Sequence, residues 1–197
     1  MGVMRISRTA AALFAALCLG AADTRAQSDA ARTISEDAAI LFGELCVTTR
    51  GDAKRIDEII TKQRLQALPL SEDGVRDLLE GKPGDLGWIV RTDRGTGLQL
   101  HLTPTMCNMR AMDTDDAAVN QVLAALLEGL AVAENFKVEK VMDERRPTNG
   151  GEERLVGYRL TWQAVNWSAN LGISHIAGDG KDIPPQVSIT LALRQST

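Results

Sequence analysis

The spacing of the hydrophobic residues changes near residue 85, from the period of helices to the period of strands. Before this point, Ile56, Ile59 and Ile60 recur at helical spacing among charged residues. From Leu98 to Leu102 every second residue is a leucine and the residues between are polar, which is typical of a strand with one apolar face. Such strands need a second layer that buries this face. The sequence therefore predicts an α+β fold of a single domain, an antiparallel sheet with helices packed on one face.

The order of the expected elements agrees with this architecture. Helices are expected from Ser35 to about Thr49, from a cap at Asp52 to Leu68, and in a short segment after Ser71. The later elements are a hairpin over 88–91 and 98–103, a strand over 106–112, a long helix over 113–134, a second hairpin over 136–145 and 154–162, and a last strand over 187–194. Residues 163–185 show no clear period and are expected to form a long loop, and no internal repeat is visible.

The first residues have the pattern of a secretory signal peptide. Arg5 and Arg8 precede an apolar stretch from Ala10 to Leu19, and small residues lead to a cleavage site after Ala26. The apolar stretch is too short for a stable transmembrane helix. Three segments are expected: a signal peptide over 1–26, a flexible leader over 27–34 and a single domain over 35–197.

The charge of the chain argues against nucleic acid as a partner. The 22 Lys and Arg residues stand against 26 Asp and Glu residues, with a formal net charge of -4 and a sequence pI near 5.3. Binding to a phosphate backbone needs a basic face, so no nucleic-acid partner is expected. An unidentified protein or small molecule is expected instead, with no stable membrane span after cleavage of the signal. The predicted location is the periplasm or the cell exterior.

Two cysteines, Cys46 and Cys107, remain outside the signal segment. An even number of cysteines in an exported chain favours a disulfide, because the compartment is oxidising. A loop of this length would stabilise the fold by about 4 kcal/mol on the chain-entropy view. The alternative is a reactive thiol, but neither cysteine is placed at a helix N-terminus or beside a cation. A structural disulfide is therefore predicted.

Several landmarks in the sequence keep a fixed order. They are Cys46, Leu68-Pro69, Gly81-Lys82-Pro83-Gly84, Trp88, Cys107, Asp113, Thr148-Asn149-Gly150, and Tyr158 four residues before Trp162. As a set they resemble a family of small exported bacterial proteins of unknown function, over about residues 39–194. The resemblance implies that the two cysteines form a structural pair. It brings no catalytic residue and no cofactor, and the chain departs from it in the greater length of segment 163–185.

Few residues offer catalytic or metal-binding chemistry. His101 is expected on the polar, exposed side of a strand. His175 could join Asp179 and Asp182 in a metal or acid–base site, although their spacing matches no known ligand pattern. Acidic residues around Asp113 are explained by helix capping, since the offsets of an EF-hand are missing. No catalytic residue and no cofactor is therefore predicted.

Trp167 is the one candidate binding residue. It is a large aromatic residue in a polar segment, where it would either anchor a partner or cap the core of the domain. The predicted function is that of an exported, non-catalytic binding or accessory module. The alternative is a periplasmic hydrolase or metal-dependent enzyme that uses loop 163–185.

Overall fold

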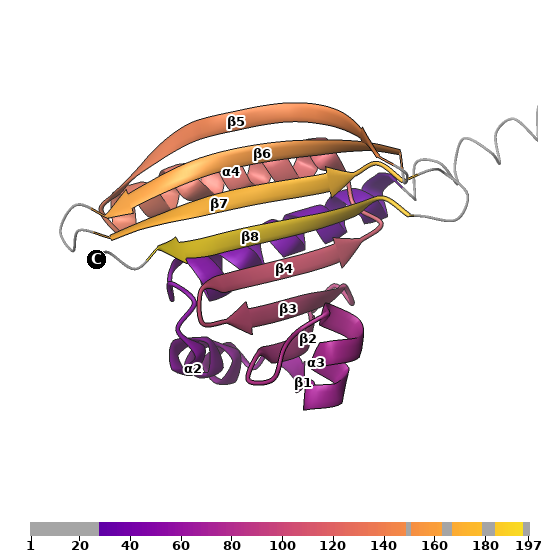
Figure 1. Ribbon diagram of the computed structural model, residues 1–197, viewed down its shortest axis with the longest axis vertical. Helices are drawn as coiled ribbons and strands as arrows, with labels where there is room; N and C mark the ends of the chain where they lie inside the picture. Colours follow the sequence, from indigo (N-terminus) through magenta and orange to yellow (C-terminus); the bar gives the residue numbers. More distant parts are fainter. Residues whose placement is uncertain (1–27, 149–150, 163–166, 179–183, 195–197) are drawn as a thin grey trace, which may run out of the picture.

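One antiparallel sheet of eight strands organises the molecule (Figure 1). The computed structural model describes residues 28–148, 151–162, 167–178 and 184–194. Within the sheet the strands follow the order β1-β2-β3-β4-β8-β7-β6-β5. The prediction of an α+β fold with an antiparallel sheet is confirmed.

The elements have the following bounds. Residues 28–42 are α-helical and continue into a π-helical turn, and the helical elements after them are η1 (Gly43–Val47), α2 (Ala53–Gln63), α3 (Glu72–Leu79) and α4 (Asp116–Ala133). The strands are β1 (Gln66–Pro69), β2 (Leu86–Arg91), β3 (Gly97–Thr103), β4 (Met106–Met112), β5 (Phe136–Thr148), β6 (Gly151–Trp162), β7 (Trp167–Ile176) and β8 (Gln186–Arg194).

Side-chain caps begin three of the helices where the sequence places them. The carboxylate of Asp52 accepts a hydrogen bond from a backbone N–H in the first turn of α2, and the hydroxyl of Ser71 does the same for α3. Asp115 accepts from the backbone N–H of Ala118 at the start of α4. Each cap satisfies a donor that the helix itself leaves unpaired. This geometry confirms capping as a role of the acidic run that precedes α4.

The sheet consists of two meanders of four strands that meet at its centre. Strands β1 to β4 form one meander and β5 to β8 the other, and β4 pairs with β8 in antiparallel register. Helix α4 carries the chain from β4 at the centre to β5 at the far edge. Each half therefore places four strands side by side in chain order, with α3 inserted between β1 and β2 of the first half.

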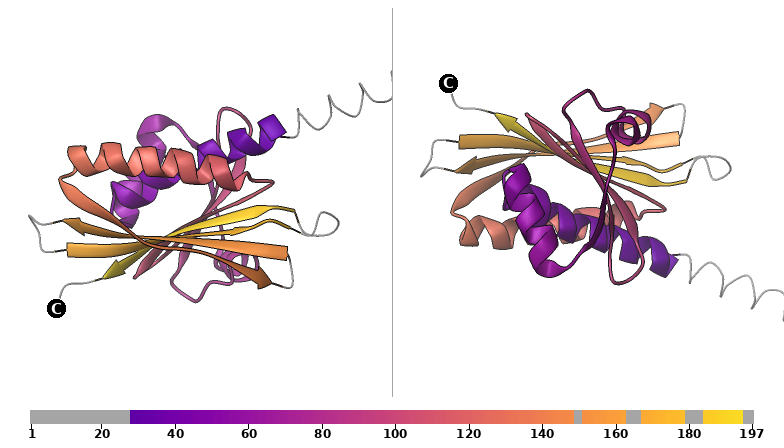
Figure 2. Two further views of the ribbon diagram at one scale, coloured as in Figure 1. Left: turned by 90° about the horizontal axis from the view of Figure 1, so that it is seen from above. Right: turned by 90° about the horizontal axis from the view of Figure 1, so that it is seen from below.

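The main core lies between the sheet and the helices on one of its faces. The N-terminal helix and α4 both lie on this face, as Figure 2 shows. Their buried residues, among them Phe42, Leu45 and Leu123, join the same cluster as Leu100 and Ile189 of the sheet. We call this side the helix-covered face and the opposite side the open face.

Helix α3 is the exception to this one-sided cover. Trp88 and Val90 belong to the main core, so Gly87, which directly precedes Trp88 in the strand, points to the open face. A Cβ at Gly87 would lie within 3.1 Å of side-chain atoms of Val75 and Leu79, both on α3. The close approach explains the glycine, and it places α3 over the β2 end of the open face (Figure 2).

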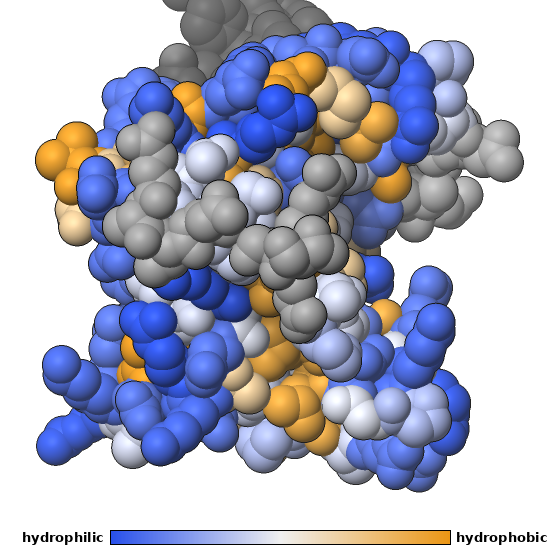
Figure 3. Space-filling model, turned by 60° about the vertical axis from the view of Figure 1, so that its left-hand side comes forward, coloured by the Kyte–Doolittle hydropathy of each residue, from blue (hydrophilic) through white to orange (hydrophobic). Residues whose placement is uncertain are grey.

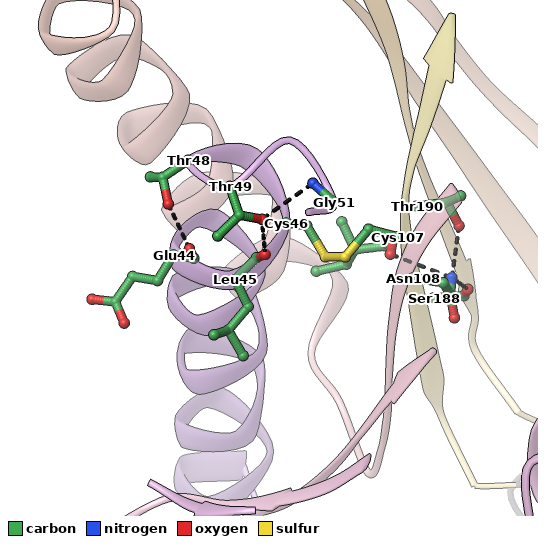
Figure 4. Close-up of a disulfide and its surroundings, with 11 residues drawn as sticks. Glu44, Leu45, Cys46, Thr48, Thr49, Gly51, Cys107, Asn108, Ser188 and Thr190 are labelled. Carbon is green, nitrogen blue, oxygen red and sulfur yellow. Dashed lines mark hydrogen bonds between the residues drawn. A yellow bond between two sulfur atoms is a disulfide. The ribbon is translucent and has the colours of Figure 1, made fainter. Parts of the chain in front are cut away.

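The disulfide predicted from the sequence is present. Cys46 of η1 is bonded to Cys107 of β4, with both residues fully buried (Figure 4). Next to it, the hydroxyl of Thr49 donates to the carbonyl of Leu45 and accepts from the backbone N–H of Gly51. The bond ties the helical layer to the middle of the sheet, and it is compatible with an oxidising, exported compartment.

Three of the expected segments differ in the structure. The expected leader, 27–34, is helical from residue 28 onward. The second helix ends at Gln63, and β1 occupies residues that were expected to continue it. The expected loop 163–185 contains strand β7. Its inward residues alternate with Ser168, Asn170 and Gly172, whose low strand propensity hides the period.

Helix α4 is, by length and composition, apolar enough to cross a membrane. The expectation of no stable membrane span after cleavage of the signal stays a prediction. In the structure Val119, Leu123 and Leu127 of α4 are buried in the main core. A single helix that passes this test of length and composition is weak evidence for a membrane span.

Candidate functional site

The open face of the sheet carries rows of polar and small residues that cross several strands. In one row Gln99 pairs with Arg110, Arg110 with Ser188, and Ser188 with Ser174. These four residues come from β3, β4, β8 and β7, and the cross-strand register brings them together although they are up to 89 positions apart in the chain. The next row on the open face contains Gly172, which has no side chain to project from the sheet there.

A cleft of about 450 Å³ lies over this row. Its lining includes Glu80, Gln99, Arg110, Ser174, Gln186 and Ser188. Its volume lies within the usual range for small-molecule sites, roughly 300 to 1,000 Å³. We call it the open-face cleft. None of these side chains was predicted from the sequence as a site residue.

Arg110 lines the open-face cleft between Gln99 and Ser188 of the row, and it is half-buried. Among the residues that the structure describes, its guanidinium has neither an ion-pair partner nor a hydrogen-bond acceptor. A guanidinium carries five N–H donors and stays charged at any physiological pH. Arg110 therefore presents an unsatisfied positive charge to the cleft.

The two serines of the cleft differ in the hydrogen bond that each can still make. The Nδ2 atom of buried Asn108 donates to the Oγ of Ser188 over 2.7 Å, which leaves the hydroxyl hydrogen of Ser188 available. The hydroxyl of Ser174 donates to Oε1 of Glu153 over 2.5 Å, which leaves its oxygen available as an acceptor. Ser188 is therefore a donor to the cleft and Ser174 an acceptor.

Glu153 keeps Ser174 in this role. The residue is 8% exposed, and its carboxylate accepts a hydrogen bond from Ser174 on one oxygen and from Arg146 on the other. These hydrogen bonds, that of Ser174 first, hold the pKa of Glu153 below its ordinary value despite the opposing effect of burial. The carboxylate is therefore ionised at neutral pH, and it can only accept.

His101 is buried on the open face beneath the end of α3, so the expectation of an exposed histidine is wrong. Its Nε2 lies 3.2 Å from Oδ2 of Asp85, and both side chains are nearly buried. A Cβ at Gly81 would lie 3.2 Å from the same ring nitrogen. The histidine thus fastens the segment after α3 to β3, and its burial keeps it away from a ligand.

His175 lies in strand β7 rather than in a loop. It is 7% exposed, it faces the helix-covered side, and its Nε2 lies 3.5 Å from the carbonyl oxygen of Thr114. Its expected companions, Asp179 and Asp182, fall outside the described residues. No group of three or more His, Cys, Asp or Glu side chains that could hold a metal ion occurs within the part of the chain that is described.

Charged residues near His175 form a closed network. Arg154 binds both carboxylate oxygens of Asp143 at 2.9 Å and one of Asp116, also at 2.9 Å. Arg145 binds Glu152 and lies 3.9 Å from Asp116. The pKa of Asp143 is held well below its ordinary value by the hydrogen bond from Arg154 and, to a smaller extent, by the one from Lys140. The hydrogen bonds to Asp143 and Asp116 in turn raise the pKa of Arg154. We call this group the Arg154 network; its charges are satisfied within the protein.

Trp167 is the first residue of β7 and lies against Trp162. Their ring centroids are 4.5 Å apart in an edge-to-face arrangement, and Trp162 packs in turn on Phe136. The guanidinium carbon of Arg50 lies 5.6 Å from the centroid of the Trp167 ring. Trp167 is half-buried beside the main core. This packing fits the core-capping alternative, and the role of Trp167 as a partner anchor stays a prediction.

The comparisons with known proteins add no relative. No protein-family model, no curated protein and no solved structure matches this chain. The resemblance to a family of small exported proteins therefore stays a prediction. The function has to be argued from the geometry.

Proposed function

We propose that the chain is an exported, non-catalytic binding module that takes a small polar molecule in the open-face cleft. The observation that carries the proposal is Arg110, which lines a 450 Å³ cleft and has no ion-pair partner among the described residues. A guanidinium that makes no ion pair keeps its N–H donors available for a ligand. By contrast, the charged groups of the Arg154 network form ion pairs with one another within the protein.

The neighbours of Arg110 support binding rather than catalysis. A hydrolytic site needs a nucleophile within reach of a base. Ser188 accepts from an amide and Ser174 donates to a carboxylate that also binds Arg146, so neither serine has a histidine as its hydrogen-bond partner in the described structure. The cleft offers donors and acceptors in fixed positions, which is what recognition of a ligand requires.

The edges of the sheet argue against a partner that adds a strand. Strand β1 is four residues long and ends in Pro69, and β5 is rich in charged residues and carries a bulge between Lys140 and Met142. Such features protect an edge from pairing. On the side shown in Figure 3, hydrophilic residues cover most of the surface, and hydrophobic residues form a narrow band and small separate groups.

Export to the periplasm or the cell exterior is part of the proposal. The signal-like N-terminus supports it, and the Cys46–Cys107 disulfide is compatible with it. Denaturing mass spectrometry of the full chain after export tests this part. Removal of residues 1–26 and a deficit of two hydrogens are expected, and an intact N-terminus or two free thiols would contradict it.

A pair of glycine variants tests the ligand site. Gly97 lines the cleft and Gly172 lies on the open face outside it, and a Cβ at either position meets no atom within 4 Å. Gly97→Phe should fill one end of the cleft, whereas Gly172→Phe adds the same ring elsewhere on the open face. In native mass spectrometry of the exported protein, the wild type and Gly172→Phe should carry a small molecule that Gly97→Phe lacks. A wild-type chain without such a molecule, or equal retention by both variants, would overturn the proposal.

A further inference from the structure

We propose that the ligand of the open-face cleft is a small organic carboxylate that also carries a hydroxyl or ammonium donor. This inference rests on the proposed function and specifies the chemistry of the same site. It follows from the order of donors and acceptors along the row of four strands.

The carboxylate end of the ligand is assigned to Arg110 and Ser188. The guanidinium and the free hydroxyl hydrogen of Ser188 are neighbours across β4 and β8, and both donate. The fixed fork of a guanidinium matches the two oxygens of a carboxylate. Asn108 acts as a positioning residue, because its Nδ2 holds the hydroxyl oxygens of Ser188 and Thr190 at 2.7 Å each.

The donor end of the ligand is assigned to Ser174. Its hydroxyl hydrogen is held by Glu153, so its oxygen can only accept from a ligand. Glu80, an acidic residue, also lines the cleft. The cleft thus offers acceptors as well as a cation, and a simple inorganic anion would leave those acceptors without a donor.

The spacing sets the scale of the ligand. Arg110 and Ser174 are separated by strand β8, so their backbones lie two strand spacings apart, roughly 10 Å. The arginine side chain spans part of this distance. A carboxylate and a donor group joined by a short carbon chain therefore suit the cleft.

Four probes separate the two ends of the ligand. The probes are 4-aminobutyrate, which has both groups; butyrate, which lacks the donor; butylamine, which lacks the carboxylate; and inorganic phosphate. Each is titrated into the ¹⁵N-labelled exported protein while amide shifts are recorded by NMR. Shifts should map to β4, β7 and β8 around the cleft. We expect 4-aminobutyrate to bind about three- to tenfold more tightly than butyrate, and butylamine to cause no shift there.

Three variants assign the contacts. Arg110→Met should weaken 4-aminobutyrate by about 10- to 100-fold, whereas Arg159→Met, which removes an arginine elsewhere on the open face, should leave the affinity unchanged. Ser174→Ala should abolish the preference for 4-aminobutyrate over butyrate, and Ser168→Ala should retain it. The last pair compares two serines of the same strand face.

The outcomes distinguish this inference from the function on which it rests. Phosphate that binds as well as 4-aminobutyrate, or butylamine that binds alone, would overturn the ligand chemistry and leave a binding cleft in place. An unchanged affinity in Arg110→Met would overturn the assigned carboxylate contact. Shifts that map away from the cleft for every probe would contradict the ligand chemistry, and with a native spectrum free of small molecules they would overturn the binding function as well.

Discussion

Both faces of the sheet contain a half-buried arginine, and the two arginines differ in what they contact. On the helix-covered face, Arg154 binds Asp143 from β5 and Asp116 from α4. On the open face, Arg110 has no acidic partner among the described residues. Because the partners of Arg154 come from different elements, that arginine holds the fold together. Arg110 contributes no such link, and its charge remains available to a ligand.

Other interactions that link separate elements also lie on the helix-covered face. The disulfide, the stack of Trp162 and Trp167, and the Arg154 network all lie on the helix-covered face. Changes there should lower the free energy of unfolding. Changes in the open-face cleft should alter binding with little effect on stability, and the following experiments, from the largest effect to the smallest, test that division.

Removal of the disulfide should have the largest effect. Cys46 and Cys107 enclose a loop with a sequence separation of 61, so replacing both by serine should cost about 4 kcal/mol of stability on the chain-entropy view. Urea denaturation of the exported protein and the double variant measures the difference. A loss below about 1 kcal/mol would mean that the helical layer is held on the sheet without this bond.

Trp167→Ala should have the next largest effect. The change removes a half-buried ring that contacts Trp162 and Arg50, and about 2 to 3 kcal/mol of stability should be lost. Thermal unfolding and titration with 4-aminobutyrate are measured on the same sample. Unchanged stability together with lost binding of 4-aminobutyrate would instead support the role of Trp167 as an anchor for a partner.

Arg154→Met should cost about 1 to 2 kcal/mol, because it leaves two aspartates near each other without their shared cation. Arg159→Met is the matched control, since Arg159 lies on the same strand and makes one exposed ion pair with Glu139. The control should change stability by less than about 0.5 kcal/mol. Equal losses in both variants would show that the Arg154 network is no stronger than an exposed pair.

Acid should weaken the helix-covered face through the same network. The pKa of Asp143 is lowered by Arg154, so its folded value lies below its ordinary value of 3.8. Its contribution to stability is therefore complete above pH 3.8 and is lost as the pH falls further, through the folded pKa. Urea denaturation at pH 6, 4 and 3 should show declining stability, with a smaller decline in Arg154→Met. Parallel declines would exclude this origin.

Local signals in the sequence account for much of the fold. Capping residues such as Ser71 and Asp115 act on their own helices, and alternating leucines define β3, so short segments suffice to predict them. The disulfide followed from the export signal and the even number of cysteines. Strand β7 was missed because its outward residues are Ser, Asn and Gly, which are common in loops.

The candidate site could not be predicted in the same way. Arg110 and Ser188 are neighbours only because β4 pairs with β8, a contact between residues 78 positions apart. Nothing in the local sequence indicates this register, or that Arg110 has no ion-pair partner among the described residues. The sequence analysis therefore turned to the rarer residues, His175 and Trp167, and the structure places both in packed surroundings on the helix-covered face.

Arg110→Met should give the smallest change in stability, within about 0.5 kcal/mol of the wild type, because no described interaction is lost. The methionine keeps much of the length of the side chain and removes the charge. If Arg110 is retained for a ligand, this variant should unfold at the same urea concentration as the wild type while binding of 4-aminobutyrate is lost. A clear loss of stability without ligand would show that Arg110 serves the fold, as Arg154 does, and would remove the reason for assigning a ligand to the open face.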